Sequence, residues 1–196
     1  MEGCPRIHIV MASRNAGRFL DPQIASIRDQ SWTNWKLWIR DDGSTDGTRE
    51  RLQQWAEDER IELLTPQQSG EGAAHAFFCA LLLVPKDAEY FALCDQDDVW
   101  VGGKLEECLR KIEELETAHP GAPCLVHSDL TVVNERMELV AESFFRYQGL
   151  SPNERNNVRD LLVQNHVTGC TCLFNKALLD RLIHGGLPES VCMHDW

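Results

Sequence analysis

The hydrophobic residues in the first 120 positions alternate between two spacings. Short runs at residues 7–11, 36–40, 61–65 and 90–94 are predicted to form strands, and the last has the composition of a strand that is buried on both faces of a sheet. Each run is followed by polar turn-forming residues and then by apolar residues at helical spacing. This alternation predicts right-handed βαβ crossovers and a parallel sheet, with the loops that follow the strands gathered at one edge.

Four helices are expected between and after these strands. The first is predicted to begin at Asp21 and Pro22, since Asp favours the N-cap and Pro the first helical position. In the third, Phe77 and Phe78 fall within a helical apolar pattern, which favours packing in the core over a role in ligand binding. The fourth is amphipathic and is expected to end near Pro120.

The pattern changes in residues 121–196. Apolar runs at 124–127 and 130–133 predict two short strands, and residues 139–147 an extended or irregular segment. The remaining expectations are a polar loop at 152–159, a short helix near Leu161, a strand at 167–174 interrupted by Gly169, and a helix over 175–183. The chain is therefore predicted to form one α/β domain with a regular first half and a mixed second half.

Charge and composition narrow the classes of protein that fit this architecture. The 31 acidic against 19 basic residues give a net charge of -12, which argues against nucleic acid as a partner because phosphate binding needs basic residues. An anionic substrate would need local positive charge, which a metal ion could supply. The sequence has no apolar run approaching 18 residues and no basic-then-apolar leader, which favours a cytoplasmic location.

Eight cysteines are spread through the chain, mostly inside apolar patterns and without CxxC spacing. We predict that they are reduced and buried, because a free Cys is usually interior. The alternative is that Cys170 and Cys172 form half of a zinc site, although a second pair of ligands is missing from the sequence.

The sharpest candidate for chemistry is the acidic turn that follows the fourth strand, in the stretch YFALCDQDDVW. Asp95, Asp97 and Asp98 fall within four positions, with Gln96 between the first two. Ligands of open α/β sheets bind at the carboxyl ends of strands, and an Asp-x-Asp turn there can hold a hard divalent cation beside a diphosphate. The alternative is a solvated acidic turn that caps the next helix.

Two further acidic motifs follow predicted elements. Residues 41–48, DDGSTDGT, come directly after the second strand and are dense in turn formers. The chain ends with His194, Asp195 and Trp196. Three acidic motifs at such positions are difficult to explain in a domain with a purely structural role.

In this order, the motifs DDGSTDGT, CDQDDVW and HDW resemble those of the family 2 glycosyltransferases of the GT-A fold, over essentially the whole chain. HSDL, FFRYQGL and VTGCT are similar to the bacterial rhamnosyltransferase-like subgroup. The resemblance implies an α/β fold with a Rossmann-like, mostly parallel central sheet flanked by helices. Residues 1–120 would form the nucleotide-sugar-binding half, and residues 121–196 the acceptor and catalytic half, which would be incomplete at its carboxy-terminal side.

The resemblance also implies roles for single residues. Asp42 would accept a hydrogen bond from the nucleotide base, Asp97 would bind Mg2+ or Mn2+ directly, and Asp95 would lie nearer the ribose and the water shell of the metal. Asp195 would be the general base. The other residues expected to contact the nucleotide are Ala12, Arg14 and Gln96; of these, Ala12 and Arg14 replace the Thr and Tyr of many relatives, which leaves base preference open.

The implied reaction is a metal-dependent, inverting transfer from a nucleotide-diphosphate sugar to a hydroxyl group. The donor would be dTDP-rhamnose, with UDP- and GDP-sugars as alternatives. The acceptor would be a saccharide or lipid-linked saccharide of a bacterial surface polysaccharide, at the inner face of the membrane, with peripheral membrane association left open. The base would remove the acceptor proton, a contribution of about 10²- to 10⁴-fold in rate.

Other functions remain open at this point. The main alternative is a nucleotide-sugar-binding domain without turnover, because the chain ends at the HDW motif. A glycoside hydrolase fits less well, since paired carboxylates for hydrolysis need neither a metal turn nor a nucleotide loop. His194 could orient Asp195, contact the diphosphate or pack, and Trp196 could line the sugar site or pack in the interior.

Overall fold

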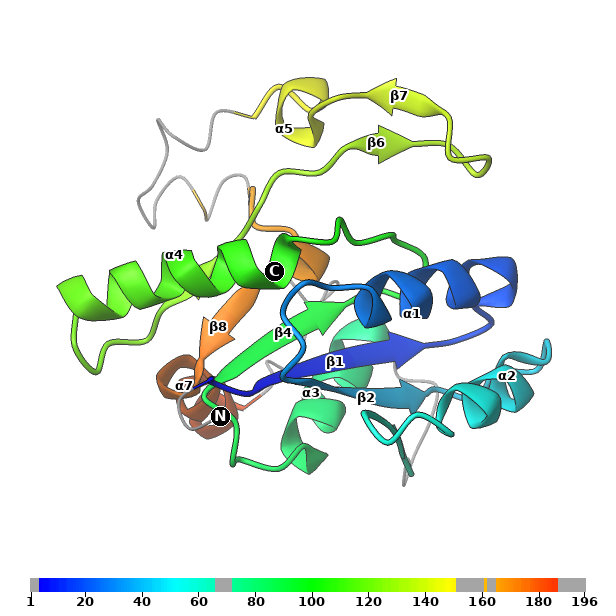
Figure 1. The fold of residues 1–196 in the computed structure, drawn as a ribbon, viewed down its shortest axis with the longest axis horizontal. Helices are drawn as coiled ribbons and strands as arrows, with labels where there is room; N and C mark the ends of the chain where they lie inside the picture. Colours follow the sequence, from blue (N-terminus) through cyan, green and yellow to red (C-terminus); the bar gives the residue numbers. More distant parts are fainter. Residues whose placement is uncertain (1–3, 66–71, 151–160, 162–164, 187–196) are drawn as a thin grey trace.

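The computed structural model describes residues 4–65, 72–150, 161 and 165–186, and it shows a three-layer α/β domain (Figure 1). The central sheet has six strands in the order β3-β2-β1-β4-β8-β5. Their bounds are β1 Ile7–Ser13, β2 Trp35–Asp41, β3 Ile61–Leu64, β4 Tyr90–Cys94, β5 Leu125–Val126 and β8 Leu173–Asn175. The four strands predicted in the first half are thus confirmed and form one continuous part of the sheet.

The strand register places the loops that follow β1, β2 and β4 at one edge of the sheet. Strands β3, β2, β1 and β4 are parallel, with Ser13 opposite Asp41 at the ends of β1 and β2. Met11 of β1 lies opposite Cys94, so β4 ends at nearly the same level. The residues that follow these three strands therefore leave the sheet together, as the alternating pattern predicted.

Helices cover both faces of the sheet (Figure 1). Their bounds are α1 Leu20–Arg28, α2 Thr48–Trp55, α3 Ala73–Leu83, α4 Lys104–Ala118, α5 Phe144–Tyr147 and α7 Lys176–Gly185. One core packs α1, α2 and α4 against side chains such as Ile9 and Ile39, and the other packs α3 and α7 against Val10 and Phe91. Successive residues of a strand point to opposite faces, which explains why these strands, covered on both faces, are mostly apolar.

The start of α1 differs from the prediction. A short 3-10 helix, η1 (Gly17–Phe19), leads directly into α1 at Leu20, so Asp21 is not the N-cap. The Asp21 carboxylate instead accepts a hydrogen bond from the Trp55 indole at 2.9 Å and pairs with Arg51 at 3.6 Å. Asp21, which was predicted to cap the helix, thus forms a tertiary contact between α1 and α2 instead.

The second half of the chain is less regular than predicted. The predicted strand over 167–174 is a 3-10 turn, η2 (Gly169–Thr171), followed by β8, which runs antiparallel to β4. The segment predicted as extended or irregular contains α5 after a short strand. That strand, β7 (Leu139–Ala141), pairs with β6 (Val132–Val133) in a separate two-stranded sheet, at the top of the view in Figure 1. The predicted polar loop at 152–159 lies outside the described residues.

The cysteines follow the prediction only in part. Five of those described are buried, whereas Cys79 is half-buried and Cys4 is exposed. Within the described ranges all of them are free thiols. Cys192 lies outside these ranges. In the same part of the chain, the helices are too short or too polar to cross a membrane.

His8 of β1 is a titratable side chain inside the core that contains Val10. It is 1% exposed, and its ring packs against Trp38 and Phe91 with centroids 5.3 and 5.9 Å apart. Burial lowers the pKa of His8 from 6.5 to about 4, and it outweighs the Asp87 carboxylate, which acts in the opposite direction. His8 is therefore neutral in the folded protein at neutral pH.

The free energy of unfolding is expected to fall as the pH drops from 6.5 to about 4, because the unfolded chain then binds a proton that folded His8 does not. The difference between the two pKa values corresponds to about 3 kcal/mol. Urea unfolding at neutral pH and at mildly acidic pH would measure this loss. A His8→Phe variant should lose clearly less unfolding free energy between the two pH values. An equal loss in the variant and the wild type would contradict the assignment of this loss to His8.

Candidate functional site

The loops that follow β1 and β2 are tied together at the carboxyl edge of the sheet. The Asp42 backbone N–H donates to the Ser13 carbonyl at 2.7 Å. Asn15, which has a positive φ of 51°, donates its N–H to the Ser44 hydroxyl at 2.9 Å and accepts from the Thr45 N–H at 2.8 Å. An Asn tolerates this backbone conformation better than most residues, so the loop geometry explains why Asn stands here.

Gln96 joins the acidic turn after β4 to the loop after β1. Its side-chain oxygen accepts from the Arg14 N–H at 2.7 Å and from the Ser13 hydroxyl at 3.2 Å. Its amide nitrogen donates to the Arg14 carbonyl at 3.1 Å. Both ends of the amide are thus occupied by protein groups, and Gln96 acts here as a brace between the two loops.

A cavity of about 390 Å³ opens at this edge, on the side of the sheet that α3 covers. It is lined by Ala12, Ser13, Arg14, Asp42, Gly72, Ala73, Ala76, Phe77, Asp95, Gln96 and Asp97. All six residues expected near a nucleotide or its metal are among them. The expected general base, Asp195, lies outside the described residues together with His194 and Trp196.

The two acidic residues at the end of β2, Asp41 and Asp42, have different partners. Asp42 is 6% exposed and lines the cavity, with its Oδ1 accepting from the Arg40 guanidinium at 3.4 Å. Asp41 does not line the cavity, and its carboxylate accepts from the Ser44 hydroxyl and from Arg49 at 3.3 Å. Only the second carboxylate of the pair is therefore available to a ligand in the cavity.

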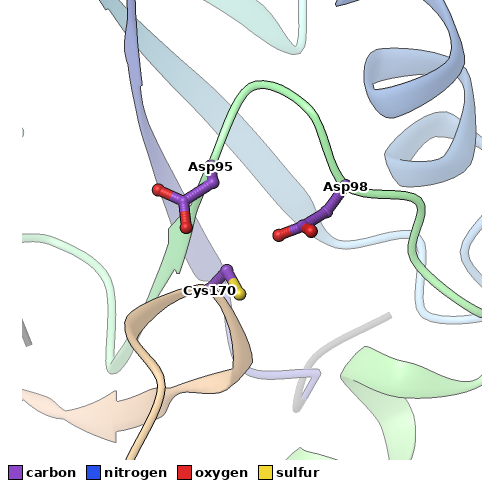
Figure 2. Close-up of side chains that lie close together, drawn as sticks. All are labelled: Asp95, Asp98 and Cys170. Carbon is purple, nitrogen blue, oxygen red and sulfur yellow. The ribbon is translucent and has the colours of Figure 1, made fainter. Parts of the chain in front are cut away.

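The acidic turn meets η2 at a cluster of three side chains (Figure 2). The carboxylates of Asp95 and Asp98 and the thiol of Cys170 each offer a ligand atom, and these atoms all lie within 4.8 Å of one another. Burial, followed by the charge of Asp98 and a hydrogen bond to it, raises the pKa of the Cys170 thiol. A thiol that keeps its proton is a poorer metal ligand than the two carboxylates.

Asp97 lies on the cavity wall and is not part of this cluster. Burial, and then the charge of neighbouring Asp98, raise the pKa of the Asp97 carboxyl. A divalent cation would relieve both effects, and the oxygen-rich turn provides the ligands that Mg2+ and Mn2+ prefer. The residues present therefore fit such an ion, which could be held by Asp95 with either Asp97 or Asp98.

The other cavity residues were not found from the sequence. Gly72 precedes α3, and Ala73 and Ala76 lie in its first turn; all three are small residues that leave the cavity open. Ser13 ends β1. Phe77 was expected only in the core, and it is 3% exposed in the core while also lining the cavity. The small size of the residues at the start of α3 could have indicated a cavity, but the same apolar spacing is also found in helices that only pack in a core.

A mostly parallel sheet with a cavity at the carboxyl ends of its strands, framed by acidic loops, is the arrangement in which open α/β folds bind a ligand. Residues 8–183 match the family described as Glycosyl transferase family 2. The chain belongs to that family.

Curated relatives carry names of glycosyltransferases. The chain is 37% identical over 100 residues to UDP-Glc:alpha-D-GlcNAc-diphosphoundecaprenol beta-1,3-glucosyltransferase WfgD of Escherichia coli, a match over 51% of this chain and 38% of that protein. It is 23% identical over 177 residues to GalNAc(5)-diNAcBac-PP-undecaprenol beta-1,3-glucosyltransferase of Campylobacter jejuni, over 90% of this chain and 53% of that one. The chain thus spans about half of these relatives or less.

Solved structures support the fold. Mannosyltransferase PcManGT from Pyrobaculum calidifontis, in complex with GDP-Man and Mn2+, matches 99% of this chain and 50% of its own with a TM-score of 0.66 and 20% identity. S. aureus TarS 1-349 in complex with UDP matches 90% of this chain and 48% of its own with a TM-score of 0.65 and 15% identity. At these identities the likeness establishes the GT-A fold alone.

Proposed function

We propose that this chain provides the donor site of a metal-dependent, inverting glycosyltransferase that uses a nucleotide-diphosphate sugar. The observation that carries the proposal is the 390 Å³ cavity, which is lined by Asp42, by Arg14 and by Asp95 and Asp97 of the acidic turn. A carboxylate suits an N–H donor of a base, and an acidic turn suits a cation bound to a diphosphate.

The residues of the chain would act on the donor in distinct ways. Asp42 would accept a hydrogen bond from the base, and the brace formed by Gln96 would keep the loop after β1 at a fixed distance from the acidic turn. Asp95 and Asp97 would hold Mg2+ or Mn2+, which when bound stabilises the negative charge of the leaving diphosphate. The cavity walls formed by Ala73 and Ala76 would leave room for the donor.

The acceptor side rests on the family resemblance and on the relatives. Asp195 would remove the proton of the attacking hydroxyl, and one-step attack would invert the anomeric carbon. The names of the Escherichia coli and Campylobacter jejuni relatives include undecaprenol-linked diphosphates. This supports a lipid-linked saccharide as acceptor. A surface polysaccharide as product and a location at the inner face of the membrane stay predictions from the family resemblance. For the donor, the name of WfgD supports a UDP-sugar, whereas dTDP-rhamnose stays a prediction from the subgroup motifs.

Calorimetric titration with UDP and dTDP, each with and without Mn2+, tests the donor site directly. We expect binding that is at least about tenfold tighter with the metal, because the ion links the diphosphate to the acidic turn. Titration with adenosine diphosphate is the control for a general affinity for diphosphates. Equal affinity with and without Mn2+ would contradict the metal-dependent site, and the absence of binding would contradict the proposed function as a whole.

A further inference from the structure

Arg40 is a buried cation of β2 next to the cavity. It is 2% exposed and lies opposite Ala12 of β1 and Leu64 of β3, which both pack against an apolar core. Placing a guanidinium in such surroundings costs free energy unless the group is paired and hydrogen-bonded. Its position therefore calls for a specific partner, and the strand direction brings Asp42 within reach.

The pairing fixes the Asp42 carboxylate from behind the cavity wall. The Arg40 Nη2 donates to the Asp42 Oδ1 at 3.4 Å, and the two side chains are 3% and 7% exposed. The backbone of Asp42 is held separately, through its N–H bond to Ser13. With the main chain anchored to β1 and one carboxylate oxygen directed to Arg40, the orientation of the carboxylate toward the cavity is set before a ligand arrives.

The neighbouring pair of Asp41 and Arg49 differs from the pair of Asp42 and Arg40, because its arginine is exposed. Arg49 contacts Asp41 at 3.3 Å, but its side chain is 57% exposed. Exposed pairs of this kind contribute little to stability or geometry. Arg40 and Arg49 thus offer two arginine–aspartate pairs near the end of β2, of which only the buried pair includes a residue that lines the cavity.

We propose that Arg40 is a positioning residue that sets base preference: it holds Asp42 so that the carboxylate receives uracil or thymine in preference to guanine. Uracil and thymine present one ring N–H between two carbonyl oxygens. Guanine presents two adjacent donors, a ring N–H and an amino group, which together match both oxygens of a carboxylate. A carboxylate that already directs one oxygen to Arg40 fits the single donor better.

This inference rests on the proposed function, because it concerns the nucleotide of the same site. Its test is titration of the whole protein with UDP, dTDP and GDP in the presence of Mn2+, for the wild type and for Arg40→Met, Arg40→Lys and Arg49→Met. The wild type is expected to bind UDP and dTDP at least about tenfold more tightly than GDP, the worth of one charge-assisted hydrogen bond.

The two arginines are expected to differ sharply. Arg40→Met should weaken UDP binding by about tenfold or more and reduce the preference for UDP over GDP, because the carboxylate loses its fixed orientation. Arg40→Lys keeps the positive charge but not the planar guanidinium, so it should retain part of the UDP affinity and part of the preference for UDP over GDP. Arg49→Met should stay within about twofold of the wild type, as expected for an exposed pair.

Thermal melting followed by circular dichroism identifies variants that are folded. If Arg40→Met does not fold, Arg40→Lys decides the test, and an unchanged ratio of UDP to GDP affinity in that variant would overturn the inference. A wild type that prefers GDP would also overturn it while leaving the donor site intact. A wild type that binds none of the three nucleotides would overturn the proposed function and the inference together.

Discussion

An Asp97→Asn variant is expected to lose sugar transfer by about 10³-fold or more, together with the part of nucleotide affinity that depends on Mg2+ or Mn2+. Asp97 lies on the cavity wall, where burial and Asp98 raise the pKa of its carboxyl. An amide keeps the shape of this side chain but removes the charge that would bind the ion. Initial rates with a UDP-sugar, and titration of UDP with and without Mn2+, measure both effects.

Asp98→Asn and Cys170→Ser are the matched controls, because these residues belong to the other group that could hold the ion. If Asp97 and Asp95 bind the metal, Cys170→Ser should leave the metal-dependent affinity within about twofold of the wild type. Loss of that affinity in Cys170→Ser and Asp98→Asn, with retention in Asp97→Asn, would reject Asp97 as the ligand. The ion would then be assigned to the cluster of Figure 2.

An Asp195→Asn variant is expected to bind nucleotide as the wild type does and to transfer sugar about 10²- to 10⁴-fold more slowly. This residue lies outside the described ranges, and the expectation rests on its place in the HDW motif. An amide of the same size cannot take the proton of the acceptor hydroxyl, so the loss should fall on kcat at saturating donor and acceptor. Donor affinity, measured by calorimetry, should not change.

The control for this second variant is Asp180→Asn. Asp180 is a half-exposed carboxylate of α7 that pairs with Lys176 at 3.6 Å and is not one of the residues that line the cavity. Both kcat and donor affinity should stay at the wild-type level. A wild-type kcat in Asp195→Asn would reject the residue as general base, and a loss of donor affinity would indicate that it acts on the donor instead.

The first half of the fold followed from the sequence because its strands are buried on both faces and its helices on one. The run at residues 90–94 and the helix after it differ so clearly in spacing that type and order could be predicted. The positions of Asp42, Asp95 and Asp97 at one cavity followed as well, since parallel strands deliver their carboxyl ends to one edge.

The parts that were missed depend on contacts between distant segments. Asp21 looks like a helix cap, but the Trp55 indole, 34 positions away, provides its hydrogen bond. The same holds for Cys170, which reaches the acidic turn because η2 packs against the end of β4. Neither residue has a local pattern that reveals its partner, so spacing along the chain could not have identified these contacts.

The position of β8 has a consequence for synthesis on the ribosome. This strand pairs with β4 and carries Phe174, whose ring stacks on Phe91 with centroids 6.0 Å apart. The 78 residues from 95 to 172 separate the end of β4 from the start of β8 along the chain. A nascent chain that has already formed β1 to β4 thus carries an open strand edge and a Phe91 ring that lacks its stacking partner. Protection of that edge must wait until residues 173–175 have left the exit tunnel.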